Sequence, residues 1–243
     1  MRTLYTLLAA AFLSTTSTAD AKSGFYLGAD ANYGFYKTDS RVFSEDTTNF
    51  LSNNASSDTR NINENRQLFD YSLYFGYLFN VASNFHVGPE FGIIVGEKVL
   101  AKNPSLAVRF PANDQFGFTA TKRMSYIPSL TFAYDFPNIA TMLFAQIGAE
   151  ISNIIFKSEV NAVSTGDNFK SQTTSKRLTQ ARIALGVSKE LDETFSVVAK
   201  VAHTFRGKVK PNQDFPPFDD EETLQNSIKT SVTRVSIGFT VNL

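Results

Sequence analysis

The sequence predicts an all-β protein: a transmembrane antiparallel up-and-down β-barrel of eight strands, with short periplasmic turns and long extracellular loops. Three observations lead to this fold class. Long segments alternate between apolar and polar residues, the connections between them alternate between short and long, and the chain begins with an export signal. One face of each segment is oily and the other carries small and polar residues. That pattern is typical of a barrel with lipid outside and a polar interior, whereas a soluble barrel has the opposite polarity.

The N-terminus predicts a secretory signal peptide. A basic start at Met1-Arg2 precedes an apolar run from Leu4 to Leu13, and Ala19-Asp20-Ala21 is a small-x-small cleavage site. The apolar run is too short for the roughly 20 residues of a spanning helix. We expect cleavage after Ala21, with Ala19 as the neighbouring option, so that residues 1–21 are removed and 22–243 form one barrel domain.

The first predicted strand runs from Ser23 to Lys37 and alternates without a break. Apolar residues lie on one side of it and glycine, tyrosine and polar residues on the other, which is the period of a β-strand. The segment is longer than the usual strand of about 5–6 residues. It matches the about 9–11 residues that a tilted strand needs to cross a bilayer.

Seven more segments with the same alternation follow. They cover about 67–79, 85–95, a fourth that ends at Phe136, 141–153, 177–189, 195–206 and 234–243. Pro89 and Pro128 fall inside the third and fourth segments, where proline removes a ladder donor. We expect a bulge or a local break at each proline, or a shift of these two segments by a few residues.

The connections between the segments alternate in length. The short ones are 80–84, 137–140 and 190–194, and the long polar ones are about 38–66, 97–115, 154–176 and 207–227. Short periplasmic turns and long outer loops are the arrangement of outer-membrane barrels. An even number of strands also places both termini on the periplasmic side.

The composition agrees with this fold and excludes several classes of protein. The chain is formally neutral, which argues against nucleic acid as a partner. It has no cysteine, and its 23 Phe and 9 Tyr suit aromatic girdles at the membrane interfaces. A mean hydropathy of −0.14 is compatible with a membrane barrel, because only alternate strand residues are apolar.

The last segment has apolar residues at every second position: Val235, Ile237, Phe239, Val241 and Leu243. With the signal peptide, the eight segments and the alternating connections, the chain resembles the small outer-membrane barrels of Gram-negative bacteria, which include the OmpA transmembrane domain, OmpX-like barrels and opacity-type adhesins. The resemblance covers the whole mature chain and implies an outer-membrane location and recognition by the barrel-assembly machinery. The family's last strand usually ends in an aromatic residue, whereas this one ends in Leu243.

Eight charged residues are predicted to face the barrel interior: Asp30, Asp70, Glu90, Asp135, Glu150, Arg182, Lys200 and Arg234. A charge inside a narrow barrel must be paired or wet, and an eight-stranded barrel has an interior that side chains fill. We therefore expect a central salt-bridge network that plugs the barrel. At similar heights we expect the pairs Glu150–Arg182 and Asp30–Arg234, with Glu90 across the lumen from Lys200. The alternative is a solvated lumen with loose pairs.

The sequence offers little for catalysis. Its two histidines are His86, predicted to face inward near a turn, and His203, predicted to face outward near the outer leaflet. We expect no enzyme activity, no cofactor and no metal site. Two alternatives remain: a narrow channel for small solutes, and a lipid-modifying enzyme that uses His203.

The outer connections predict where partners would bind. The run Asp219 to Glu222 could bind a divalent cation or be a solvated acidic tip. Cationic side chains could meet the phosphates of lipopolysaccharide: Lys98, Lys102, Lys122, Arg123, Lys208 and Lys210. The first connection, rich in Asn, Ser and Thr, is exposed to host molecules. The sequence thus predicts a monomeric surface protein that displays four loops, with membrane lipid, lipopolysaccharide and an extracellular ligand as partners.

Overall fold

The computed structural model describes residues 23–46, 56–96, 98–106, 115–161, 170–210 and 222–243. The predicted signal peptide and its cleavage site after Ala21 lie outside these residues, and the division into signal peptide and barrel domain stays a prediction. No helix among the described residues has the length and hydropathy needed to cross a membrane.

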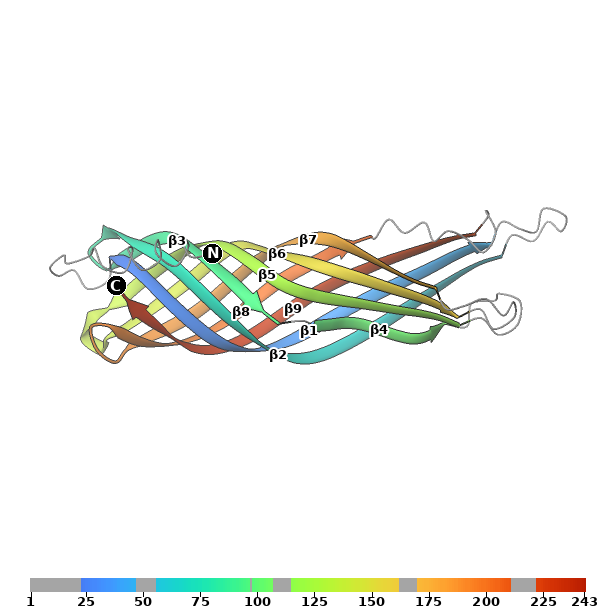
Figure 1. The fold of residues 1–243 in the computed structure, drawn as a ribbon. Helices are drawn as coiled ribbons and strands as arrows, with labels where there is room; N and C mark the ends of the chain where they lie inside the picture. Colours follow the sequence, from blue (N-terminus) through green and yellow to red (C-terminus); the bar gives the residue numbers. More distant parts are fainter. Residues whose placement is uncertain (1–22, 47–55, 97, 107–114, 162–169, 211–221) are drawn as a thin grey trace, which may run out of the picture.

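The described residues form one antiparallel sheet that closes into a barrel (Figure 1). Its strands are β1 (Gly24–Asp46), β2 (Ser56–Ala82), β3 (Phe85–Val95), β4 (Lys98–Leu106), β5 (Gln115–Phe136), β6 (Thr141–Asn161), β7 (Lys170–Glu190), β8 (Phe195–Val209) and β9 (Glu222–Asn242). β1 pairs with β9, and β3 pairs with β5, which closes the ring. β3 and β4 follow one another along β5, so these nine strands occupy eight positions in the ring. The predicted fold class is confirmed.

The break between β3 and β4 lies at Gly96. Its φ is 126°, a backbone conformation that side chains with a Cβ rarely adopt. β3 pairs with the part of β5 from Ser125 to Tyr134, and β4 with the part from Phe116 to Lys122. The glycine thus allows the chain to bend between β3 and β4, which together occupy one position in the ring.

One end of the barrel carries the short connections and both ends of the described chain. The turn between β5 and β6 is a 3₁₀-helix, Pro137–Ile139, which ends at Ala140 in the left-handed conformation. In the turn between β7 and β8, Asp192 Oδ1 accepts hydrogen bonds from the backbone N–H groups of Thr194 and Phe195, both at 2.8 Å. We call this end the turn end and the opposite one the loop end.

The two prolines sit in continuous strands. Pro89 pairs with Leu130 and Pro128 with Phe91, without a register shift between β3 and β5. On the other side of each proline the strand pairing is interrupted. Pro89 has no partner in the β2–β3 pairing, and Pro128 has none in the β5–β6 pairing. The register is the same before and after each interruption. The expected local breaks are present and the expected bulges are not, because each proline can omit its hydrogen bond on one side while it keeps the strand direction.

The outer face of the turn-end part is apolar. Phe69, Tyr71, Leu73 and Phe75 of β2 are more than half exposed, and so are Leu185 of β7 and Ile237 and Phe239 of β9. Polar side chains from the same strands are buried inside, including Ser72, Ser188 and Ser236. An apolar exterior around a polar interior is the polarity of a barrel that lies in lipid.

The strands continue far into the segments that the sequence assigned to loops. β1 extends to Asp46 and β2 starts at Ser56, while β6 extends to Asn161 and β7 starts at Lys170. The long connections are therefore shorter than expected. Their outer parts are mainly polar segments that continue the strands, although they have no apolar outer face by which the sequence could identify them as strands.

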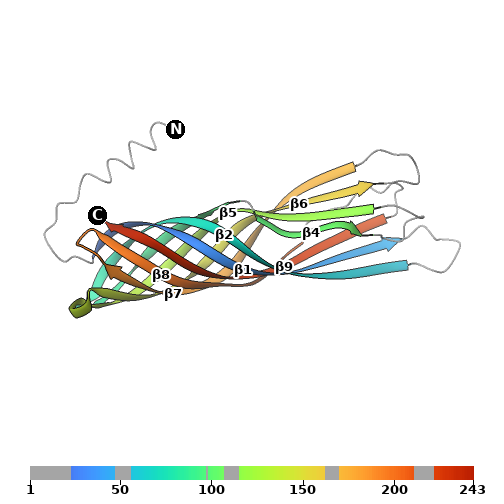
Figure 2. The ribbon, with the colours of Figure 1, turned by 90° about the horizontal axis from the view of Figure 1, so that it is seen from below.

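Towards the loop end the ring separates into two sheets. Within the described residues, β2 pairs with β3 from Tyr71 downward, and β7 pairs with β8 from Arg182 downward. Above these points one sheet consists of β2, β1, β9 and β8, and the other of β4, β5, β6 and β7. Figure 2 shows these two groups of strands diverging towards the loop end. We call the closed ring the turn half and the two-sheet part the loop half.

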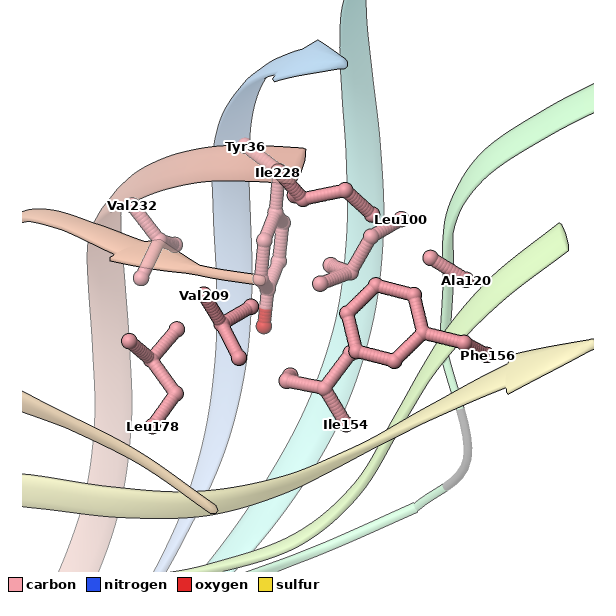
Figure 3. Packing of buried hydrophobic residues seen from close by; sticks show 9 residues of the cluster. All are labelled: Tyr36, Leu100, Ala120, Ile154, Phe156, Leu178, Val209, Ile228 and Val232. Carbon is pink, nitrogen blue, oxygen red and sulfur yellow. The ribbon is translucent and has the colours of Figure 1, made fainter. Parts of the chain in front are cut away.

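An apolar cluster fills the space between the two sheets of the loop half. One sheet contributes Tyr36, Val209, Ile228 and Val232, and the other contributes Leu100, Ala120, Ile154, Phe156 and Leu178, all of them buried. Figure 3 shows these side chains pointing toward one another across the gap. The loop half is thus packed like a β-sandwich, in which the inner faces of two sheets form the core.

Candidate functional site

The candidate site is a cluster of buried charges at the level where the turn half meets the loop half. Arg234 of β9 is at its centre and is 2% exposed. Its Nη1 donates to Glu150 Oε2 at 2.8 Å and its Nη2 to Glu150 Oε1 at 3.0 Å, which is a two-point guanidinium–carboxylate pair. The same guanidinium bonds Tyr36 Oη at 3.0 Å and approaches Asp70 Oδ2 at 3.4 Å. Four strands are therefore joined through one side chain.

A second cation, Lys122 of β5, shares the Glu150 carboxylate. Its ammonium is ion-paired with Glu150 Oε1, and both side chains are almost fully buried. Thr204 Oγ1 donates to the other oxygen, Oε2, at 2.7 Å. Glu150 thus accepts hydrogen bonds from three partners, which offsets the cost of burying its charge.

The sequence placed Lys122 outside, at the second hairpin, among the cations that could meet lipopolysaccharide, and that placement is wrong. The register between β5 and β6 shifts between Lys122 and Ser125, so the strand has a bulge there. Odd-numbered residues of β5 face inward below the bulge, and Ala120 and Lys122 face inward above it. A bulge adds one residue to a strand and reverses which face the following side chains occupy. The alternation alone carried no sign of this reversal.

Below this cluster, Asp30 and Lys200 form a second buried pair. Lys200 Nζ lies 2.6 Å from Asp30 Oδ2, and Ser72 Oγ donates to the same oxygen at 3.1 Å. The Lys200 ammonium also lies 4.2 Å from the centre of the Tyr74 ring, within the range of a cation–π contact.

Glu90 of β3 has neutral partners. Its Oε2 accepts hydrogen bonds from Tyr26 Oη and from Gln146 Nε2, both at 2.8 Å. Gln146 Nε2 also lies 3.3 Å from Thr131 Oγ1. Hydrogen bonds thus join Glu90 to two neutral side chains, Tyr26 and Gln146.

The partners differ from those expected from the sequence. The expected pairs were Glu150–Arg182, Asp30–Arg234 and Glu90–Lys200, but Glu150 binds Arg234, Asp30 binds Lys200, and Glu90 binds Tyr26. The register explains the change: Arg182 lies opposite Gly148, one inward position from Glu150, and Arg234 lies opposite Gly34, two inward positions from Asp30. Arg182 and Asp135 are buried in the same interior, at 6% and 6% exposure.

Tyrosines and glycines fill the rest of the turn half. A Cβ on Gly28 would lie 2.2 Å from the Tyr74 ring, and a Cβ on Gly76 would lie 2.4 Å from the Tyr26 ring. Each ring therefore lies across a glycine of the neighbouring strand. The cavity left beside them measures about 60 Å³, which is room for a few water molecules.

The two histidines lie apart. His86 is buried and faces inward near the turn end, whereas His203 is half-buried on the outer face. His203 Nδ1 is 2.9 Å from Thr233 Oγ1, and its ring meets Phe205 edge-on. Within the part of the chain that the structure describes, no three side chains of His, Cys, Asp or Glu gather as metal ligands would.

Several candidate residues of the outer connections lie outside the described residues, or their side chains do. Asp219, Asp220 and Glu221 of the acidic run lie outside the described residues, and the side chain of Glu222 is not described, nor are those of Lys98 and Lys102. Arg123, Lys208 and Lys210 are exposed. The possible cation site at the acidic run stays a prediction.

The C-terminal strand has the predicted orientation. Val235, Ile237 and Phe239 of β9, which pairs with β1 and β8, are between 49% and 64% exposed, and Leu243, which follows the strand, is 41% exposed. Whether the assembly machinery recognises this strand stays a prediction.

Comparison with known proteins gives structural likenesses alone. No protein-family model and no curated protein sequence matches the chain. Among solved structures it is similar to the outer membrane protein OprG of Pseudomonas aeruginosa (15% identity, 91% of this chain and 97% of that chain, TM-score 0.45). It is also similar to the outer membrane protease OmpT of Escherichia coli (8% identity, 95% and 99%, TM-score 0.44) and to the attachment invasion locus protein Ail of Yersinia pestis (11%, 89% and 99%, TM-score 0.40).

These identities and TM-scores are low, so the assignment of this chain depends on its own sheet and surfaces. The ring closes through the pairing of β3 with β5, its turn half is apolar outside, and buried polar and charged side chains fill its interior. With these features, the chain is a small β-barrel with a lipid-facing exterior and eight strand positions in the ring that the described residues form.

Proposed function

We propose that this protein has a structural and surface-interacting role: a sealed barrel that anchors four extracellular loops in the outer membrane. The observation that supports this role is that the lumen is filled at two successive levels. The Arg234–Glu150–Lys122 cluster crosses the barrel, and the apolar core lies directly above it. A barrel filled in this way serves as a rigid anchor, and any binding specificity belongs to the connections at the loop end.

The proposal excludes the alternative of a narrow channel. Water and ions would have to cross both the ion-paired layer and a dry core that contains Phe156, Ile154 and Ile228, which are essentially unexposed. Moving a hydrated ion through an apolar layer carries a large desolvation cost. The turn-half cavity beside Tyr26 and Tyr74, of about 60 Å³, is far smaller than a continuous pore.

Planar-bilayer recording of the refolded chain tests this role. We expect no stepwise conductance, while a 16-stranded porin inserted by the same procedure gives steps. Reproducible steps that scale with the amount of folded chain, and vanish when it is unfolded, would contradict the sealed barrel.

Catalysis at His203 is the remaining alternative, and the proposal is that this histidine is structural. Its contacts with Thr233 and Phe205 hold an interfacial side chain in place. The lipid A of cells that express the wild-type chain should match the lipid A of cells that express His203→Ala. A difference in acylation between the two would support an enzyme instead.

The display role has its own test on whole cells. Cells that export the wild-type chain should adhere to an immobilised extracellular-matrix mixture more than cells in which residues 47–55, 107–114, 162–169 and 211–221 are replaced by short Gly-Ser linkers. Equal adhesion, with both proteins present at the surface in equal amounts, would leave the barrel without an interaction role and contradict the proposal.

A further inference from the structure

A stripe of positive charge crosses the outer face of the loop half. It consists of Lys37 and Arg41 of β1, Lys229 of β9, and Arg206, Lys208 and Lys210 at the end of β8, all of them exposed. The strand registers bring these residues together: Lys229 lies opposite Lys208 on one side and opposite Asp39 on the other. We call this set the basic stripe.

A bulge in β8 creates half of the stripe. The register between β8 and β9 shifts between Thr204 and Gly207. Below the shift the even-numbered residues, such as Thr204, are buried; above it Val209 is buried and joins the apolar core, while Lys208 is exposed. The extra residue therefore turns Val209 inward and two lysines outward in one step.

The stripe places two positive charges directly opposite each other on neighbouring strands. Like charges on directly opposite residues of neighbouring strands destabilise a sheet, and Lys208 and Lys229 are such a pair. The positive charge of Lys210, more than that of Lys229 or Arg41, lowers the pKa of Lys208. Of the side chains described on this face of β1, β8 and β9, one is acidic: Asp39, which is already ion-paired with Arg206. Asp39 also lies opposite Lys229, so the described side chains of the stripe give one carboxylate for six cations and leave an excess of positive charge.

A groove lies next to the stripe on its turn-end side. Its volume is about 520 Å³, and its lining includes Phe35, Lys37, His203, Ser231 and Thr233. Phe35 and Phe205 are about 44% exposed and mark the upper limit of the apolar belt on β1 and β8. Lys37 is the next outward residue after Phe35, one strand repeat of about 7 Å further from the belt. The groove and the stripe therefore lie where lipid acyl chains give way to headgroups.

We propose that the basic stripe and the groove form a binding site for a phosphate-bearing lipid of the outer leaflet, with the phosphates on the lysines and arginines of the stripe and the adjoining part of the lipid in the groove. The site rests on the outer-membrane orientation of the barrel, with its loop end outside. Charge complementarity favours this occupant, since an anionic headgroup removes the repulsion between Lys208 and Lys229. Continuity with the apolar belt favours a lipid over a soluble anion.

The experiment compares two double variants of the refolded full chain. Lys208→Gln/Lys229→Gln removes the opposed pair. Lys157→Gln/Arg177→Gln is the matched control, because it removes two exposed cations from the outer face of the other sheet of the loop half. Each protein is placed in phosphatidylcholine nanodiscs with increasing amounts of diphosphoryl lipid A, and its unfolding temperature is measured. The quantity compared is the amount of lipid A at which the increase in unfolding temperature reaches half of its maximum.

We expect the stripe variant to need about tenfold more lipid A than the wild type, because each cation near an anionic membrane surface contributes to binding. The control variant should behave as the wild type. Without lipid A, the stripe variant should unfold at the same or a higher temperature than the wild type, since its like charges are gone. A residue with a merely structural role would instead lower the stability without lipid A.

Two outcomes would overturn the proposal. Equal responses of the stripe and control variants to lipid A would show that the stripe is not the site. A stabilisation of the wild type by inorganic diphosphate equal to that by lipid A would assign the site to a soluble anion. Both results are independent of conductance and adhesion, so the failure of this site and the failure of the proposed function are distinguishable.

Discussion

The turn half and the loop half use the same strands with opposite polarity. In the turn half the apolar side chains of β1 and β9, such as Phe25 and Phe239, face outward, while Asp30 and Ser236 are buried inside. In the loop half Tyr36 and Ile228 are buried inside, while Lys37 and Lys229 are exposed. The solvent explains the difference, because lipid surrounds the turn half and water surrounds the loop half. The turn half therefore buries its polar side chains, and the loop half buries its apolar ones.

The change of polarity requires an interface inside the barrel, and the Arg234 cluster lies there. Tyr36 contributes its ring to the apolar core and its hydroxyl to Arg234. Leu178 and Gln180 of β7 make a similar transition: Leu178 joins the core, and Gln180 Nε2 donates to the carbonyl oxygens of Phe205 and Thr230 at 2.7 and 2.8 Å. The junction therefore holds the two sheets together where β7 and β8 cease to pair.

The strongest way to break this arrangement is to neutralise the residue that both halves share. Glu150→Gln leaves Arg234 and Lys122 buried without their carboxylate, and removal of one partner from a buried ion cluster costs about 4 kcal/mol. We expect a large fall in unfolding temperature and faster hydrogen exchange in both halves. Glu193→Gln, which changes an exposed carboxylate at the turn end, is the control. A normal melting curve for Glu150→Gln would mean that the cluster is wet and loosely paired.

A deletion in the apolar core should separate the two halves. Phe156→Ala removes the largest fully buried aromatic side chain of the cluster and should cost about 3 kcal/mol through lost burial and a cavity. We expect faster hydrogen exchange in the loop half while the turn half stays protected. Ile155→Ala, on the outward face of the same strand, is the control. Equal loss of protection in both halves would show that they unfold as one unit.

The turn half can be tested alone at a glycine. Gly28→Ala forces a Cβ against the Tyr74 ring, and overpacking of this kind costs about 2 kcal/mol. Gly24→Ala is matched, because its Cβ would meet Leu243 O at an ordinary 3.6 Å. Equilibrium unfolding in urea should separate the two variants. If Gly28→Ala is as stable as Gly24→Ala, the tyrosine and glycine do not interlock.

The smallest effect is expected at the seam between β7 and β8. Gln180→Leu removes two hydrogen bonds to backbone carbonyls and should cost about 1 kcal/mol. Local hydrogen exchange at residues 205–209 should increase, with Thr179→Val, on the exposed side, as control. Unchanged exchange in this segment would mean that the core alone holds the seam.

The sequence allowed prediction of the turn half more fully than of the loop half. Alternation in segments such as 23–37 and 141–153 identified the strands, the outward apolar face and the eight charged side chains that are buried in the interior, because lipid exposure demands a regular pattern. In the loop half, strands such as 38–46 carry mainly polar residues on both faces, so they were assigned to loops.

Bulges limited the prediction of the candidate site. Lys122 was missed because one additional residue in β5 reverses its direction, and Lys208 is exposed for the same reason in β8. A visible signal existed in β8, where the apolar Val209 between two lysines fits a core position better than a membrane-facing one. The pairing of charges was missed because the heights of side chains on different strands depend on the register, and Arg234 lies two inward positions from Asp30.

Hydrogen exchange of the refolded barrel, measured by mass spectrometry on peptides from both halves, tests the central claim most directly. The account predicts slow exchange in residues 38–46, 56–66, 154–161 and 170–176, which lie in strands around the apolar core. Exchange in these segments as fast as in an unstructured peptide, with the turn half still protected, would contradict a folded two-sheet loop half.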